Sequence, residues 1–247
     1  MRLFGDERAV SDVLAFIIVF SIIITSVALV YGTGFSSLDN VREGEQKANA
    51  ERAMEALALS MNDIVAGETP RRGGSLDLGG GLLEVAETET TVKVNGTKVY
   101  NETTNAFAYT VGTTTVAYEN GGVFRSDRDA SINVRRASMT CNGDRAVVSL
   151  VVLRTDSGAI DSQGDVEVTM VEQNSSVVYH DTDPGTENLQ VRIDDTQFAA
   201  GWNRSLNGAS EYDWSADEPS ASTVEAVCST DAVIVRVTVI DVTFETP

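Results

Sequence analysis

The chain opens with a long apolar run. Residues 13–31 carry no charged side chain, and 13 of these 19 positions are Val, Ile, Leu or Phe. As a helix rising about 1.5 Å per residue, the run would span roughly 28 Å, close to the hydrocarbon thickness of a bilayer. Insertion is favourable by several kcal/mol, which offsets the hydroxyls of Ser21, Thr25 and Ser26. The pattern predicts a transmembrane helix over residues 13–31, with those hydroxyls bonded to the helix's own carbonyls.

Two other interpretations of this run are weaker. A cleaved secretory signal has a shorter apolar region of about 7 to 15 residues and a basic head. Here the head carries two acids between Arg2 and Arg8, although Gly32 and Gly34 are small enough for a cleavage site. A buried helix of a soluble protein rarely needs 19 uncharged positions in succession, so an anchor that is retained is favoured.

A second, amphipathic helix is expected over residues 32–67. We expect the glycine pair at 32–34 to break the first helix, and Gly67, with Pro70 beyond it, to end the second. Apolar side chains recur at spacings of three and four, at Ala50, Met54, Leu57, Met61 and Ile64. This stripe suits a helix packed on its own domain and equally one that also packs against copies of itself.

Beyond Pro70 the apolar positions alternate with polar ones, as in half-buried antiparallel strands. The alternating positions are Val92 and Val94, Phe107, Tyr109 and Val111, Val166, Val168 and Met170, and Leu189, Val191 and Ile193. Three Asn-Gly pairs, at 95–96, 120–121 and 142–143, predict tight hairpins with positive backbone angles. The predicted fold class is α+β, mainly β, with an antiparallel β-sandwich-like domain over residues 68–247.

Two strands and one helix stand out within this domain. Residues 146–153 (AVVSLVVL) are nearly all apolar, which predicts a strand covered on both faces. In the terminal run VIVRVTVIDVTF the apolar parity changes, which predicts a β-bulge near Val239 and Ile240. Between them, residues 195–206 carry Phe198, Trp202 and Leu206 four apart behind Asp195, which predicts a short helix capped by that aspartate.

The chain has two cysteines, Cys141 and Cys228, both downstream of the apolar run. One structural disulfide in an oxidising compartment fits two thiols at that separation. On the chain-entropy model, such a bond contributes about 4 to 5 kcal/mol of stability. The alternative, two buried free cysteines, stays open from the sequence.

The net charge is −19, from 37 acidic residues against 18 Lys and Arg. This balance repels nucleic acid, so no nucleic-acid partner is expected. The acids are dispersed along the chain, which favours a surface adapted to very high salt over a local polyanionic site. Concentrated salt would screen their mutual repulsion.

Four N-glycosylation sequons follow the apolar run, at Asn95, Asn101, Asn174 and Asn203. Because sequons and disulfides are both features of exported domains, we expect a cytoplasmic N-terminus and an extracellular C-terminal domain. The expected localisation is the cell membrane, crossed once, with the lipid membrane as the first partner.

The sequence offers little catalytic chemistry. It has no nucleophile elbow or P-loop, and the glycines of GGSLDLGGG precede strand-like sequence, so they are expected to mark turns and a flexible joint. His180 stands beside Asp181, but adjacent strand residues point to opposite faces. We therefore expect a protein that is not an enzyme and that needs no cofactor.

One acidic segment, HDTDPGTEN, is a weak candidate for a Ca²⁺ site. Asp181, Asp183 and Glu187 could present carboxylate oxygens there. However, Gly185 is the fifth residue from Asp181, whereas an EF-hand loop has glycine at its sixth position. The favoured interpretation is an acidic Pro-Gly turn.

The segment RAVSDV, residues 8–13, followed by the apolar run, resembles the N-terminus of haloarchaeal type IV pilin-like proteins. The wider stretch to residue 58 is similar to an uncharacterised family of haloarchaeal membrane proteins with the same architecture. Residues 1–12 are then either a short cytoplasmic head or a prepilin-type leader, and the resemblance implies a cut by a prepilin peptidase between Ala9 and Val10. Asp12, at the third position after that cut, could then pair with the Val10 amine of a neighbouring subunit.

Two functions of different classes follow. In one, the chain is a non-enzymatic cell-surface protein that can enter a pilus-like filament with itself or other pilin-like subunits through its N-terminal helix. In the other, the helix is a simple tether, and the β domain binds a sugar, an ion or a protein partner.

Overall fold

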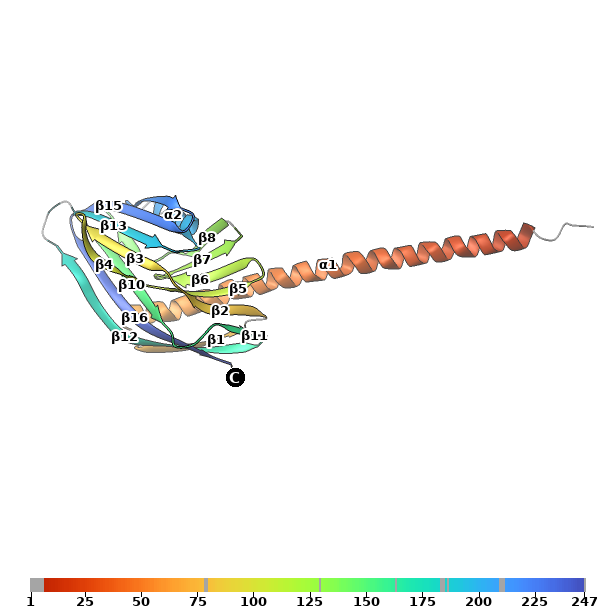
Figure 1. The fold of residues 1–247 in the computed structure, drawn as a ribbon, viewed down its shortest axis with the longest axis horizontal. Helices are drawn as coiled ribbons and strands as arrows, with labels where there is room; N and C mark the ends of the chain where they lie inside the picture. The colour runs from red at the N-terminus through yellow and green to blue at the C-terminus, as the bar shows by residue number, and fades with distance from the viewer. Residues whose placement is uncertain are drawn as a thin grey trace, which may run out of the picture. The chain divides into compact units, whose positions relative to one another are not determined.

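The computed structural model describes residues 7–77, 80–128, 130–162, 164–182, 185, 187–208 and 212–246. The chain divides into two units, one ending at Gln46 and the other beginning at Lys47. The first is entirely helical in its described part, and the second holds the end of the same helix together with a β domain (Figure 1).

Helix α1 runs from Glu7 to Val65 without interruption. The expected break at Gly32 and Gly34 is therefore wrong. A glycine inside a helix costs only about 1 kcal/mol relative to alanine, which is too little to end a helix that continues on both sides. The helix ends as expected at Gly67, which has φ +79° and donates its N–H to the Ile64 carbonyl at 2.9 Å.

The β domain contains three sheets, and the predicted mainly-β class is confirmed. The first sheet has five strands in the order β1 (Arg71–Asp77), β12 (Asp165–Asp181), β16 (Val233–Glu245), β10 (Ala146–Arg154) and β9 (Met139–Cys141). Strands β10 and β16 pair in parallel, whereas the other neighbours in this sheet are antiparallel.

The other two sheets are antiparallel throughout their described pairings. One has the order β11 (Ile160–Ser162), β2 (Gly81–Ala86), β5 (Ala106–Val111), β6 (Thr114–Glu119), β7 (Gly122–Asp127) and β8 (Ala130–Arg135). The other has the order β14 (Ser215–Ser220), β15 (Thr223–Thr230), β13 (Glu187–Asp194), β3 (Glu89–Val94) and β4 (Thr97–Thr103).

The end of α1 is part of the domain's core. Its predicted apolar stripe is buried to 3 % exposure or less, and it packs in one cluster with apolar side chains of β12, β16 and β5. This cluster, which we call the helix cluster, supports the expectation that the helix packs on its own domain. It leaves open whether copies of the helix also associate.

The prediction of a flexible joint in the glycine-rich segment is wrong, because Gly73 and Gly74 lie inside strand β1. A Cβ atom on Gly74 would come within 3.2 Å of the Leu57 side chain. Glycine therefore lets the strand approach α1 closely.

A second apolar cluster, the α2 cluster, joins β10, β13 and β15 to helix α2 (Ala199–Asn207). The predicted short helix is confirmed, with Phe198, Trp202 and Leu206 buried against the sheets. Its predicted cap is wrong. Phe198 occupies the N-cap without a side-chain hydrogen bond, and Asp195 lies three residues earlier with φ +59°.

Strand β10 is covered on both faces, whereas the two halves of β16 are covered on opposite faces, which explains the parity change in the terminal run. Val235 and Val237 belong to the α2 cluster, whereas Ile240 and Val242 belong to the helix cluster. The predicted bulge is on the wrong strand: β16 pairs with β10 without a shift, and the extra residue lies opposite Val239 and Ile240 on β12, between Glu172 and Asn174.

Two of the three predicted Asn-Gly hairpins have the expected positive angles. Asn95 and Gly96 join β3 to β4 with φ +50° and +78°, and Asn120 and Gly121 join β6 to β7 with φ +46° and +85°. The third does not. The Asn142 side-chain oxygen accepts hydrogen bonds from the backbone N–H groups of Asp144 and Arg145, so its side chain shapes a longer turn.

Candidate functional site: the exposed apolar segment and the open surface of the β domain

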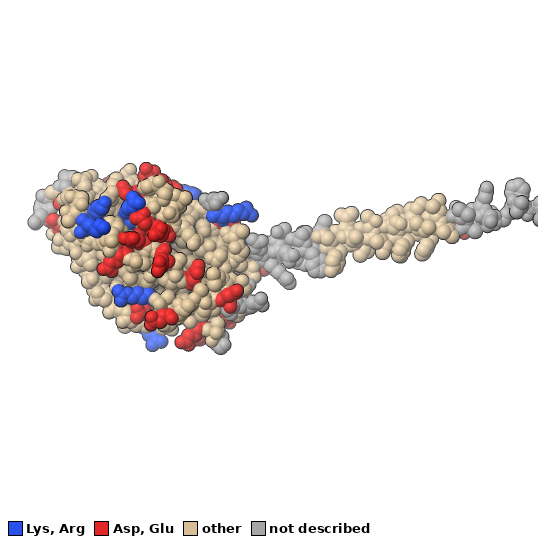
Figure 2. Space-filling model, viewed as in Figure 1, with Lys and Arg blue, Asp and Glu red and all other residues tan. Residues whose placement is uncertain are grey.

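The apolar segment of α1 is fully uncovered within the chain. The span Asp12–Gly32 is long and apolar enough to cross a membrane, and none of it is buried. Its large apolar side chains are each more than half exposed, from 51 % at Ile18 to 72 % at Val30. Beyond the acid at its start, Figure 2 shows this stretch without charged side chains, in contrast to the β domain, whose visible face carries many Asp and Glu side chains. Length and composition suit a membrane span or a signal sequence.

Two of the three hydroxyls predicted to bond within the helix, those of Thr25 and Ser26, are satisfied by it. Thr25 donates its hydroxyl hydrogen to the Ser21 carbonyl and Ser26 donates to the Ile22 carbonyl, each at 2.7 Å. These bonds are the ones expected for hydroxyls in an apolar medium, where an unpaired donor is costly.

The expected processing site lies at the start of α1, where the backbone of Ala9 and Val10 is already helical. Asp12 is exposed at the beginning of the apolar span. The cut and the contact between Asp12 and the Val10 amine of another copy both remain predictions.

The two cysteines form a disulfide. Cys141 ends β9 and Cys228 lies in β15, with their Cα atoms 6.6 Å apart. The bond links two different sheets and adds to the α2 cluster, in which both residues are buried.

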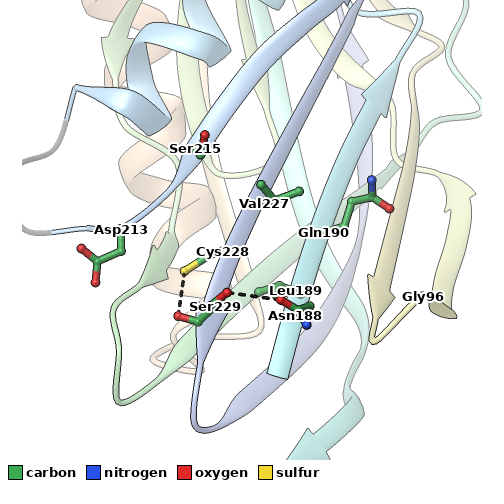
Figure 3. Close-up of a pocket in the computed structure, with 9 residues that line it drawn as sticks. All are labelled: Gly96, Asn188, Leu189, Gln190, Asp213, Ser215, Val227, Cys228 and Ser229. Atoms are coloured by element: carbon green, nitrogen blue, oxygen red, sulfur yellow. Dashed lines mark hydrogen bonds between the residues drawn. The ribbon is translucent and has the colours of Figure 1, made fainter. Parts of the chain in front are cut away.

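A shallow trough of about 730 Å³ crosses the outer face of β13, β15 and β14 (Figure 3). Gln190, Val227 and Ser215 form a row across the three strands, since Val227 pairs with both of the others. Beside this row, the Ser229 hydroxyl donates to the Asn188 side-chain oxygen at 3.2 Å. Val227 is 45 % exposed, so the row has an apolar centre, and Asp213 is the one charged side chain of the described lining.

The acidic segment does not assemble as a cation site in the described part of the chain. Asp183 lies outside the described residues, and the Glu187 carboxylate accepts a hydrogen bond from the Asn95 side-chain nitrogen at 2.7 Å. Asp181 and His180 end strand β12, where His180 is exposed. Among the described residues no three or more His, Cys, Asp or Glu side chains gather as metal ligands.

The four sequon asparagines are held in different ways. Asn95 stands in the β3–β4 turn, Asn101 on β4, Asn174 on β12 and Asn203 in α2. Both amide atoms are engaged in two of them, Asn95 and Asn203.

A buried carboxyl was missed by sequence reasoning. Glu119, at the end of β6, is completely buried, and its Oε2 atom accepts a hydrogen bond from the Thr196 hydroxyl at 2.8 Å. Its Oε1 atom and the Trp202 Nε1 atom are both buried and make no hydrogen bond of regular geometry among the described residues. Burial raises the pKa of Glu119 to about 7, and the Thr196 hydroxyl and the neighbouring Trp202 N–H both oppose that rise.

The neighbouring Asn120 is also fully buried. Its side-chain nitrogen donates to the Thr90 hydroxyl at 3.0 Å, and its oxygen accepts from the Val151 N–H at 3.3 Å. In the sequence, both residues read as the polar start of a hairpin turn, and nothing in the local pattern signals burial.

The comparison with protein families matches residues 8–244, which include the apolar segment and nearly all of the β domain. The chain belongs to the DUF7289 family, a family of unknown function. The DUF7289 match thus covers the helix and the domain together. No curated protein and no solved structure matches the chain.

Proposed function

We propose that this chain is a non-enzymatic cell-surface protein, anchored in the membrane by residues 13–31, with its β domain outside the cell. We further propose that it can enter a pilus-like filament with itself or with other pilin-like subunits. The observation that carries the proposal is the uncovered apolar segment of α1.

The energetics of that segment support an anchor. Burying one such side chain is worth about 1.5 to 3 kcal/mol, so exposing this many of them to water would be strongly unfavourable. None of the span is buried within the described part of the chain. A lipid bilayer, or the packed helices of neighbouring copies, would supply a cover.

The filament part of the proposal is supported by two further features. The helix does not stop where the apolar segment ends, and its last part is built into the core of the β domain. Asp12 is exposed at the start of the span, where a second chain's N-terminal amine could reach it.

Mass spectrometry of the chain's N-terminus, with and without an active prepilin peptidase, tests the filament part. The proposal predicts a chain that starts at Val10 when the peptidase is active and at Met1 or Arg2 when it is not. An uncut N-terminus in both cases would contradict the filament and leave a simple tether.

The trough favours a second candidate, a tethered domain that binds a neutral ligand such as a sugar. Its polar side chains are uncharged apart from Asp213, and its exposed Val227 offers an apolar centre of the kind against which a sugar ring can pack. Binding of an array of neutral glycans by the full chain, lost in Gln190→Ala and retained in Gln46→Ala, would support it. An array with no bound glycan would count against it.

A further inference from the structure

The four sequons lie in a hairpin turn, two strands and a helix, and only the two on strands suit an oligosaccharide. We propose that Asn101 and Asn174 carry N-linked glycans and that Asn95 and Asn203 do not. The inference rests on the proposed function, because the domain must lie outside the cell to meet the glycosylation machinery.

Asn101 lies on β4, the last strand of its sheet in the described chain. It is exposed, and its side-chain oxygen accepts hydrogen bonds from the Thr91 hydroxyl at 2.6 Å and from the Lys98 ammonium at 3.0 Å. These bonds hold the oxygen on the protein, and the amide nitrogen has no partner among the described residues. The hydroxyl-bearing Thr103 of this sequon is also exposed.

Asn174 lies on a second open edge. Strand β1 pairs with β12 only as far as Val171, so on that side residues 173–181 of β12 pair with no described strand. Asn174 and Ser176 are both exposed, and no hydrogen bond holds the Asn174 amide among the described residues. The extra residue of the bulge also stands here, which turns this stretch out of the regular ladder.

At Asn95, both amide atoms are engaged. Its nitrogen donates to the Glu187 carboxylate at 2.7 Å, and its oxygen accepts the Asn188 backbone N–H at 3.0 Å. The residue has φ +50° in a two-residue hairpin turn, so the sequon cannot extend without opening the hairpin.

Asn203 is also occupied, and its sequon is helical. The nitrogen donates to the Glu218 carboxylate at 2.7 Å, while the oxygen accepts from the Asn207 side chain. The third sequon residue, Ser205, lies on the buried side of α2 and is only 6 % exposed. A transferase that must engage both the amide and this hydroxyl would have to unfold the helix.

The reaction attaches one sugar to one amide nitrogen. A bond forms between the asparagine Nδ2 atom and C1 of an oligosaccharide, and the bond from C1 to the phosphate oxygen of a polyprenyl-phosphate carrier breaks. The amide nitrogen loses one proton, and the lipid-linked phosphate leaves with the electron pair of the broken bond.

The two positions share a structural consequence. Open strand edges present unpaired backbone groups that invite another strand. Residues 173–178 are all exposed and uncharged, and they include Val177 at 59 % exposure. A glycan at Asn174 would cover this edge, and one at Asn101 would cover the edge of β4.

Glycopeptide mass spectrometry of the full chain, isolated from the cells that make it, tests the inference. Thr103→Ala and Ser176→Ala each remove one proposed sequon and leave its asparagine in place; Thr97→Ala and Ser205→Ala are matched controls at the other two. We expect the loss of one glycan mass in each of the first two variants and no change in the controls. Digestion of intact cells with a protease reports separately whether the domain is outside.

The outcomes separate the two proposals. A domain that is digested from outside but is bare at Asn101 or Asn174, or is glycosylated at Asn95 or Asn203, overturns this inference alone. A domain that is protected in intact cells overturns the proposed function and this inference with it.

Discussion

The two ends of α1 differ in how their apolar side chains are covered. Residues 50–65 carry a narrow apolar stripe that the β domain covers completely, and Met54 and Met61 have no exposed surface. Residues 13–31 are apolar all round, and nothing in the chain covers them. A helix with one apolar stripe needs a packing partner on that side only. A helix that is apolar on all sides needs apolar surroundings on every side, such as a membrane or other helices. The comparison supports the proposal that residues 13–31 are covered by something outside the chain.

The largest expected effect comes from placing charges in the uncovered segment. Ile18→Arg together with Ile23→Arg should oppose insertion by about 6 kcal/mol, since each arginine near the centre of a span costs about 3 kcal/mol. The chain should move from the membrane fraction to the soluble or degraded fraction in cell fractionation. The same two positions changed to leucine should leave the distribution unaltered.

A cavity in the covered segment should act on the domain instead. Met61→Ala should lower the free energy of unfolding of the β domain by about 3 kcal/mol, because the fully buried side chain leaves a void in the helix cluster. Denaturant unfolding followed by the fluorescence of the buried Trp202 and Trp214 measures it. Ile23→Ala, the matched change in the uncovered segment, should leave that curve in place.

An equal change in the free energy of unfolding in Met61→Ala and Ile23→Ala would contradict the difference between the two segments.

A change of pH should alter the stability of the β domain, which contains a buried carboxyl, but not the membrane retention of the apolar segment. The Glu119 pKa of about 7 lies above its unfolded value of 4.5, so this group by itself should remove roughly 3 kcal/mol of stability as pH rises from 4.5 to 7 and no more above that. Glu119→Gln should flatten this dependence, as read from unfolding curves at several pH values, while exposed Glu245→Gln should not. Membrane retention should be constant over the same range, since residues 13–30 carry no titratable side chain.

If the free energy of unfolding changes between pH 5 and pH 8 in the same way in the wild type and in Glu119→Gln, Glu119 is not a buried, protonated carboxyl.

The smallest effect is expected where ion pairs hold α1 to the domain. Glu51 pairs with Arg125, and Lys47 pairs with Asp127 at 3.5 Å, all of them partly exposed. Glu51→Gln should lower stability by less than about 1 kcal/mol at low ionic strength and by nothing measurable in concentrated salt. Unfolding at two salt concentrations measures this, with Glu55→Gln as the control. A loss that grew with salt would contradict an ion-pair origin.

The sequence predicted the parts of the fold that depend on local pattern. The alternation of Leu189, Val191 and Ile193 identified β13, and the spacing of Phe198, Trp202 and Leu206 identified α2. The pairing of Cys141 with Cys228 followed from there being two cysteines.

The failures arose where tertiary packing overrides local preference. Gly32 stays helical, and Gly74 serves a close approach between β1 and α1. The parity change in β16 reflects a strand that lies between two clusters, which no single-strand pattern distinguishes from a bulge. Glu119 carried no signal, because its burial depends on α2, about 80 residues later in the chain.

Extraction of the full chain from isolated membranes tests the central claim most directly. A chain anchored by residues 13–31 should stay in the membrane pellet after a wash with alkaline carbonate, which strips peripheral proteins, and should be released by non-ionic detergent. Release of the intact chain by carbonate alone would contradict the anchor.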